Sequence, residues 1–314
     1  MTPNELITYY GLRLNPYKTG ELDSSMPEEM YVEVDGFGRE SGQIKRLAPK
    51  LQARSLVLVY GPAGCGRSSL VSFIIRNLPA PLGGVELLPV VGRVRDEQPM
   101  NAVWQVLEEL RTWMRDNNAF LNQDTLHARY EKHIANADND HPPPLGSSKD
   151  IFSDSLTVLK GLKKKPVPVI EGVFTYKQVE NAATAFQKAD VLLFTTTRED
   201  LYEAFASHQY PGFRAKVDTL GLTDVQTFLD QRWKYATGNP TAVHPFAPTA
   251  ILQVFRDRSW PFRNVADIIS DAWEKHREVT DPTVQPPAPV LDATILASAY
   301  DYVMRSGVPT GVQE

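Results

Sequence analysis

With 314 residues, 42% of them hydrophobic, the chain is long enough to bury the core of one large or two moderate domains. Its net charge of −5 argues against a protein that coats nucleic acid through bulk charge, so any DNA would have to be contacted locally. A single cysteine excludes an internal disulfide framework and a cysteine zinc site. No run of about 20 apolar residues occurs, and the first residues lack a secretory signal, so we expect a cytoplasmic protein without a membrane span.

Apolar strand patterns and helix patterns alternate along the first two thirds of the chain. A turn-rich lead-in at 1–54 ends in a predicted helix at 39–51 and is expected to pack on the core. Strands are then predicted at 55–60, 85–91, 167–170 and 191–194, with helices at 68–78, 100–114, 126–134, 152–162 and 179–186 and a loop at 135–149. Pro89 interrupts the second strand and predicts an edge position or a bulge there. The alternation predicts an α/β fold, a parallel sheet covered by helices.

Strand patterns cease after about Leu222, which marks a second, all-helical domain. Its helices are predicted at 224–235, 247–256 and 263–277. A proline-rich connector at 280–290 precedes a final helix at 292–305. The predicted domains are therefore the lead-in at 1–54, an α/β core at 55–221, a small helical lid at 222–279, and the connector with its helix at 280–314.

One motif in the core carries chemistry. GPAGCGRSS at 61–69 has the glycine spacing of a G-x-x-x-x-G-K-[ST] phosphate loop, directly after a buried strand and before a helix. Such glycines let backbone N–H groups surround a phosphate chain, and the helix N-terminus favours the same anion. A glycine turn without a ligand is the alternative. The candidate nucleotide-binding residues are Gly61, Pro62, Ala63, Gly64, Cys65, Gly66, Arg67, Ser68 and Ser69, with Ser68 also a candidate Mg²⁺ ligand.

Two residues of the loop depart from the motif. Arg67 occupies the lysine position, where a planar guanidinium can still pair with phosphate but is expected to place it less well for phosphoryl transfer. Cys65 lies near a helix N-terminus that could lower its pKa, but a tolerated small side chain is the simpler interpretation, and we assign it no chemical role. The departure at Arg67 predicts slow hydrolysis.

Several ordered segments resemble AAA+ ATPases of the origin-recognition type, including bacterial secretion and transposition ATPases. They are YYGLRLNPY (9–17), FGRESGQIKRL (37–47), the phosphate loop, VPVIEG (167–172), FTTTRED (194–200), PGFR (211–214) and the run at 245–265. The resemblance covers about residues 9–277. It implies ATP or ADP with Mg²⁺ as ligands, a P-loop core followed by a helical lid, and a homo- or hetero-oligomer with protein partners.

The resemblance also implies roles for residues outside the loop. Tyr17 becomes a candidate for the adenine pocket, with an aromatic strut as the alternative. Glu171 stands where an aspartate supports Mg²⁺, and Gly172 stands where a glutamate polarises the attacking water, so the expected base is missing. Thr196, or else Thr195, matches the first sensor of the terminal phosphate, with strand-end capping as the alternative.

Two arginines complete the set of candidate site residues. Arg214 lies where the family places an arginine finger that reaches a neighbouring subunit's nucleotide, and an exposed surface arginine is the alternative. Arg263 matches the second-sensor arginine of the lid, although Ser259-Trp260 replaces the usual glycine-rich turn. Both roles follow from the resemblance.

These features favour a nucleotide-binding regulatory or assembly subunit with weak or absent ATP hydrolysis, acting through nucleotide-dependent partner binding. An active ATPase switch or motor that acts on DNA or a protein complex is one alternative, in which a partner subunit supplies the missing groups. A nucleotide-free AAA+ scaffold is the other.

Overall fold

The computed structural model describes residues 10, 12–13, 15–17, 55–76, 78, 85–93, 100–135, 145–173, 175, 180, 182, 184–186, 193–197, 200–201, 212–279 and 293–305. The chain divides into two compact units. The sheet unit consists of 43–61 and 74–216. The lid unit consists of 1–42, 62–73 and 217–314.

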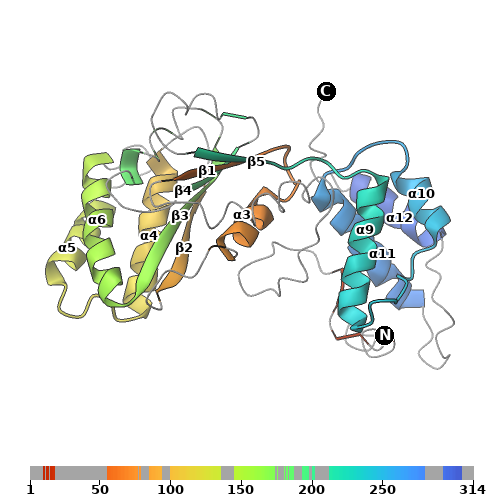
Figure 1. Cartoon of the computed structure of the whole chain (residues 1–314), viewed down its shortest axis with the longest axis horizontal. Helices are drawn as coiled ribbons and strands as arrows, with labels where there is room; N and C mark the ends of the chain where they lie inside the picture. The colour runs from red at the N-terminus through yellow and green to blue at the C-terminus, as the bar shows by residue number, and fades with distance from the viewer. Residues whose placement is uncertain are drawn as a thin grey trace. The chain divides into compact units, whose positions relative to one another are not determined.

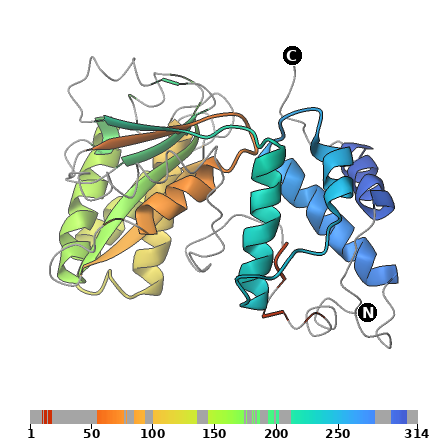
Figure 2. The same cartoon turned by 45° about the vertical axis from the view of Figure 1, so that its right-hand side comes forward.

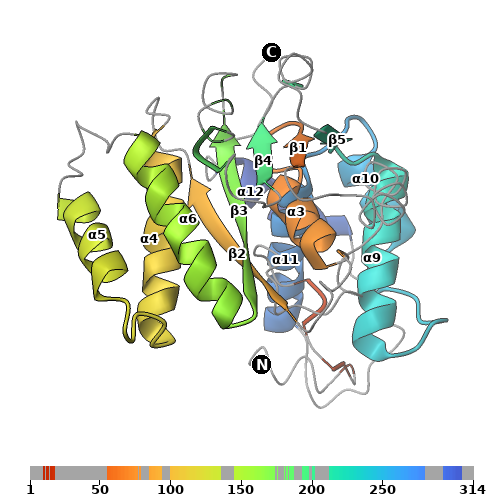
Figure 3. The ribbon, with the colours of Figure 1, turned by 60° about the vertical axis from the view of Figure 1, so that its left-hand side comes forward.

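The sheet unit is built on five parallel strands in the order β2-β3-β4-β1-β5, which Figure 3 shows side by side. The strands are β1 (Leu56–Tyr60), β2 (Glu86–Arg93), β3 (Lys164–Val173), β4 (Leu193–Thr197) and β5 (Gly212–Lys216). Leu56, Val57, Leu58 and Val59 of β1 are all at most 3% exposed. A strand that is apolar at every position suits burial on both faces, and β1 lies between β4 and β5.

The prolines of the sheet lie where a missing N–H is tolerated. Pro89 belongs to β2, which is the edge strand on its side of the described sheet, so the predicted edge position is confirmed. Pro166 and Pro168 lie in β3, an inner strand, but the pairing of β3 with β4 begins only at Val169. The first half of β3 therefore has β2 as its described neighbour.

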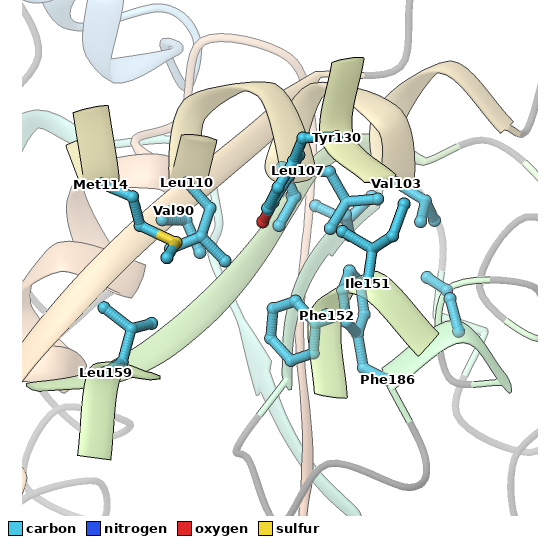
Figure 4. Packing of buried hydrophobic residues seen from close by; sticks show 14 of the residues in the cluster. Val90, Val103, Leu107, Leu110, Met114, Tyr130, Ile151, Phe152, Leu159 and Phe186 are labelled. Atoms are coloured by element: carbon cyan, nitrogen blue, oxygen red, sulfur yellow. The ribbon is translucent and has the colours of Figure 1, made fainter. Parts of the chain in front are cut away.

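Three helices of the sheet unit follow β2 and form its apolar core. They are α4 (Met100–Asp116), α5 (Asp124–Ala135) and α6 (Leu145–Gly161). Helices α4 and α6 contact β3 and each other, α4 also contacts β2, and α5 packs against α6 (Figure 1). Their buried side chains meet those of the sheet and of residues 182–186 in one cluster, in which Figure 4 labels Val90, Val103, Leu107, Leu110, Met114, Tyr130, Ile151, Phe152, Leu159 and Phe186. The spacing of the α4 residues in this cluster is that of one helix face.

The lid unit contains α9 (Leu222–Thr237), α10 (Pro248–Phe255), α11 (Phe262–Val279) and α12 (Ala293–Arg305), besides the first part of α3 (Arg67–Arg76). Helix α12 packs on α10 and α11, and α9 contacts α10 (Figure 2). Helix α9 ends at Gly238, whose φ of 68° is the left-handed conformation of a helix C-cap. The lid is therefore a compact all-helical domain.

The described part of the lead-in packs on these lid helices. The backbone N–H of Arg13 donates to the Ala236 carbonyl at 2.7 Å, and Arg232 donates to the Pro16 carbonyl at 3.3 Å. The sequence pattern instead predicts packing of the whole of 1–54 on the core. The rest of this segment, including the predicted helix at 39–51, lies outside the described residues.

The predicted fold class is confirmed: an α/β unit with a parallel sheet flanked by helices precedes a small all-helical domain. Three details differ from the prediction. Strand β5 has no predicted counterpart, because GFRAK is short and half polar; α6 begins at Leu145, inside the predicted loop; and β3 extends well beyond the predicted 167–170. Among the described helices, none is long and apolar enough to cross a membrane.

Candidate nucleotide site

The phosphate loop joins β1 to α3, as the motif requires. Gly61, Gly64 and Gly66 have φ angles of 147°, 75° and 89°, which side-chain-bearing residues rarely adopt. Helix α3 begins at Arg67, and the Leu70 N–H already donates to the Gly66 carbonyl at 2.9 Å. The first-turn N–H groups, those of Arg67, Ser68 and Ser69, therefore belong to the positions that have no partner inside a helix. This combination is the anion-binding geometry of a helix N-terminus.

The ends of three strands meet in the sheet unit, where the loop begins. The Gly61 N–H, directly after β1, donates to the Thr197 carbonyl of β4 at 3.2 Å. The Gly172 N–H, near the end of β3, donates to the Thr196 hydroxyl of β4 at 3.1 Å. Thr196 is 2% exposed, so its hydroxyl lies at a buried contact between β3 and β4. Carboxyl ends of parallel strands form the usual ligand-binding edge of such sheets.

A bulge distorts β3 at the two residues that the resemblance singles out. The pairing of β3 with β4 shifts between Ile170 and Val173, so Glu171 and Gly172 fall in the irregular stretch. Gly172 has a φ of 76°, and Glu171 is partly exposed. Toward β2, Glu171 keeps the regular register opposite Arg93, so the irregularity lies in the pairing of β3 with β4, the strand that carries Thr196.

The lid unit brings the loop together with the start of α11. The Arg263 N–H donates to the Gly64 carbonyl at 2.8 Å, so Arg263, the candidate second sensor, begins beside the loop. A Cβ added to Gly64 would lie 3.2 Å from the Cβ of Arg263 and 3.6 Å from that of Pro261. The Arg263 side chain itself is exposed. Nothing in the local sequence pattern indicates this contact, because it joins residues about 200 positions apart.

Cys65 faces the same helix start. Its side chain is fully buried, and burial raises the pKa of the thiol to about 11, against the lowering effects of a hydrogen bond from the Phe262 backbone and of the Arg67 charge. The position near a helix N-terminus predicts that the pKa of Cys65 could be lowered. That direction is wrong, because the desolvation of the thiolate exceeds the two effects that lower the pKa. The thiol is therefore neutral at pH 7.

Arg214 and Tyr17 have other described neighbours. Arg214 belongs to β5, its side chain is 48% exposed, and its guanidinium pairs with the Asp200 carboxylate at 3.0 Å. Tyr17 is 2% exposed and packs among lid aromatics: its ring stacks on Trp233 at 6.3 Å and meets Phe246 edge-on at 5.4 Å. The finger role of Arg214 and the adenine-pocket role of Tyr17 both stay predictions.

The donors that these residues present suit a nucleotide with Mg²⁺. The Ser68 hydroxyl in the lid unit and the Glu171 carboxylate in the sheet unit are each the kind of hard oxygen ligand that Mg²⁺ prefers, and their binding to one ion stays a prediction. Such an ion keeps several waters and is held by few protein oxygens together with phosphates. In the described ranges, no cluster of three or more His, Cys, Asp or Glu residues that could hold a metal occurs.

Comparison with known proteins assigns no family to the chain. No family model matches the chain, and no curated protein matches it. Among solved structures, it is similar to Drosophila ORC bound to DNA, with a TM-score of 0.49 and 15% identity over 98% of this chain and 75% of that one. It is also similar to C. elegans PCH-2, with a TM-score of 0.45 and 10% identity over 88% and 71% of the two chains.

Proposed function

We propose that this protein is a nucleotide-binding regulatory or assembly subunit of the AAA+ class that hydrolyses ATP weakly or not at all. Its output would be a change in the lid and in partner binding, driven by the bound nucleotide rather than by turnover. The observation that carries the proposal is the loop 61–66, with three glycines at positive φ leading into the N-terminus of α3.

Phosphate binding follows from this loop. The glycine conformations suit a backbone that curls around an anion, and the dipole of α3 adds positive potential at the same place. Arg67 can pair with a phosphate through its guanidinium, and Ser68 can supply a hydroxyl to Mg²⁺. The adenine preference rests on the sequence resemblance alone.

Weak hydrolysis follows from the end of β3. Gly172 has no side chain to act as a base, and its neighbour Glu171 lies in a bulge. The Thr196 hydroxyl, the candidate first sensor, already accepts the Gly172 N–H. A missing base or water-positioning group typically lowers a rate by about 10²- to 10⁴-fold. Arg67 in place of lysine adds a separate defect in phosphate placement.

The lid supports a role in signalling. The backbone N–H of Arg263 donates to the Gly64 carbonyl, so the Arg263 side chain begins beside the loop. From there it would sense a nucleotide that Arg67 and Ser68 hold. Binding would then favour one lid arrangement over others. A ligand shifts such an equilibrium by no more than the difference between its affinities for the two states.

The deciding experiment asks whether the protein binds nucleotide. Purified protein is denatured and the supernatant chromatographed for ADP or ATP, and the thermal midpoint is measured with and without ATP and Mg²⁺. At a hundredfold excess over Kd we expect a stabilisation of about 2.7 kcal/mol. Gly66→Val, which places a branched side chain at a φ of 89°, should abolish the shift, whereas Gly161→Ala, at an open helix position, should keep it.

The outcomes separate the proposal from its alternatives. No bound nucleotide, and no shift at millimolar ATP in a folded sample, would favour the nucleotide-free scaffold and contradict the proposal. Brisk hydrolysis by the native protein would favour the active switch or motor. DNA as its substrate is not indicated by the net charge of −5.

A further inference from the structure

The start of α11 lacks a cap of its own. The first intrahelical bond of this helix runs from the Val265 N–H to the Pro261 carbonyl at 3.3 Å. The N–H groups of the three preceding helix residues therefore need acceptors from elsewhere. Serine, threonine, aspartate or asparagine usually stands before the first helix residue and supplies one, but here that residue is Pro261, which has no side-chain oxygen.

The phosphate loop supplies acceptors for two of these three N–H groups. The Gly64 carbonyl accepts the Arg263 N–H at 2.8 Å, and the Cys65 sulfur accepts a hydrogen bond from the Phe262 backbone. The turn is also held from its other side, because Leu220 and Trp260 exchange two backbone hydrogen bonds of 2.7 and 2.8 Å. Asn264 and Val265, the next residues of the helix, are buried, so water is a poor substitute for these contacts.

We propose that the phosphate loop is the N-terminal cap of α11, and that the peptide group joining Gly64 to Cys65 couples bound phosphate to the lid helix that carries Arg263. This inference rests on the proposed function for its ligand. The capping contact itself does not depend on it.

The coupling follows from the two ends of one peptide group. Its C=O faces α11, while its N–H, that of Cys65, makes a long 3.4 Å contact with the Pro62 carbonyl inside the loop. A phosphate in the loop offers that N–H a charged acceptor, which forms shorter and stronger hydrogen bonds. Donation by the N–H polarises the same peptide and strengthens its C=O as an acceptor. By linkage, a firmer cap in turn favours phosphate binding.

Gly64 is required for this close approach. A side chain at its φ of 75° would be strained, and an added Cβ, 3.2 Å from the Arg263 Cβ, would push the start of α11 away by a few tenths of an ångström. The same glycine thus serves the curvature of the loop and the contact with the lid. The Cys65 side chain has a positioning role in this arrangement, since it contacts α11, whereas the Cys65 backbone N–H is the group that a phosphate would meet.

Amide hydrogen exchange of the full-length protein at residue resolution tests the cap directly. Without nucleotide, the Arg263 amide should exchange at least about tenfold more slowly than an uncapped first-turn amide, the order expected for one net hydrogen bond. ADP with Mg²⁺ should slow it further. ADP binding is measured on the same sample by calorimetry, so a lack of binding contradicts the proposed function, while the nucleotide-free protection still tests the cap.

Three variants distinguish a cap from general stability. Cys65→Ala should speed exchange at Phe262, and Cys65→Ser, which keeps an acceptor, should restore protection. Pro261→Ser gives α11 its own cap and should leave the first turn protected but unresponsive to ADP. Phe255→Leu, in the buried lid core, is the control: it should lower the thermal midpoint while the response to ADP persists.

Two results would overturn the proposal. The first is rapid exchange of the Arg263 amide in the nucleotide-free protein, because the capping bond would then be absent. The second is a protected Arg263 amide whose exchange does not change although calorimetry shows that ADP binds. In that case the loop caps α11, but the binding of phosphate is not coupled to the helix.

Discussion

At the scale of single residues, Gly172 leaves the end of β3 without the side chain that the resemblance assigns to the catalytic base. A glutamate would be the expected base at this position, yet the backbone has a φ of 76° and its N–H is bonded to Thr196. Left-handed backbone costs a side-chain-bearing residue roughly 1–2 kcal/mol. The missing base is therefore not repaired by one substitution, because the β3 bulge would have to be rebuilt.

We expect Gly172→Glu to destabilise the protein by about 1–2 kcal/mol without producing efficient hydrolysis, even when combined with Arg67→Lys. Native turnover should lie well below the roughly 1–100 per second of efficient phosphoryl-transfer enzymes. Phosphate release and thermal unfolding are measured together. The control is Gly161→Glu, at a position with nothing within 4 Å of an added Cβ, which should leave both unchanged. Fast turnover in the Gly172→Glu variant would show that the bulge is no obstacle.

Two substitutions of Tyr17 are predicted to change the stability of the protein in opposite directions. Its hydroxyl is buried without a hydrogen-bond partner among the described residues, while its ring packs against Trp233, Phe246 and Trp273. An unpartnered buried hydroxyl is unfavourable, so Tyr17→Phe should stabilise the protein by about 1 kcal/mol. Tyr17→Ala should cost about 3–5 kcal/mol through the cavity it leaves. Denaturant midpoints measure both, and a loss of stability in Tyr17→Phe would reveal a partner for the hydroxyl.

Cys65, the one cysteine of the chain, reports on the loop through its reactivity. A pKa of about 11, two units above the ordinary value of 9.0, leaves about 100-fold less thiolate at pH 7, and full burial slows reagent access further. We expect labelling by a disulfide reagent to be at least ~100-fold slower in the native protein than in denaturant. Comparable rates in both conditions would mean that the thiol is exposed in the native protein.

At the scale of elements, the sequence is most informative where one local pattern specifies the structure. The buried strand, glycine loop and helix from Leu56 to Arg76 are predictable because all their signals are adjacent. The β3 bulge could not be foreseen, since it depends on pairing with β4, and β5 lacks an apolar pattern. Likewise, the Gly64–Arg263 contact needs the tertiary fold, so the cap of α11 appears only in the structure.

The contact between α5 and α6 predicts a dependence of stability on pH. His133 of α5 is 5% exposed, lies 3.4 and 3.3 Å from the hydroxyls of Ser147 and Ser148 of α6, and has a pKa lowered by burial. Because the folded pKa is the lower one, the unfolded chain binds more protons once the pH falls below about 6.5. The stabilising contribution of the neutral imidazole is present above that pH and is lost as the pH falls.

We therefore expect the thermal midpoint to fall between about pH 6.5 and 5, and His133→Gln to make this fall shallower. Two partly buried imidazoles with lowered pKa values, His244 and His276, should retain part of the slope in that variant. His127→Gln is the matched control, since this residue is about half exposed on the same helix. An unchanged slope in His133→Gln would show that His133 does not titrate with unfolding.

At the scale of the whole molecule, the proposed output requires a second protein. A subunit that changes its lid without turnover can act only through what it contacts, and Arg214 is the residue that the resemblance assigns to a neighbour's nucleotide. Strand β5 is the edge of the described sheet, and the exposed Arg214 is bonded to Asp200 within the chain. An exposed ion pair contributes about 0–1 kcal/mol, so the pairing with Asp200 is by itself a weak competitor of a phosphate for this guanidinium.

We expect nucleotide with Mg²⁺ to promote association with itself or with a partner subunit, and Arg214→Ala to weaken that association by at least about tenfold in Kd. The substitution would remove a charge-assisted hydrogen bond to phosphate from the interface, and about 1.4 kcal/mol corresponds to tenfold. Light scattering with and without nucleotide measures the effect. Arg256→Ala is the matched control, because Arg256 is also exposed and paired with a carboxylate, that of Asp257 at 2.8 Å. Equal losses of affinity in both variants would mean that Arg214 contributes only as a surface charge. A protein that binds nucleotide but stays a monomer and associates with none of the partners tested would contradict the finger role.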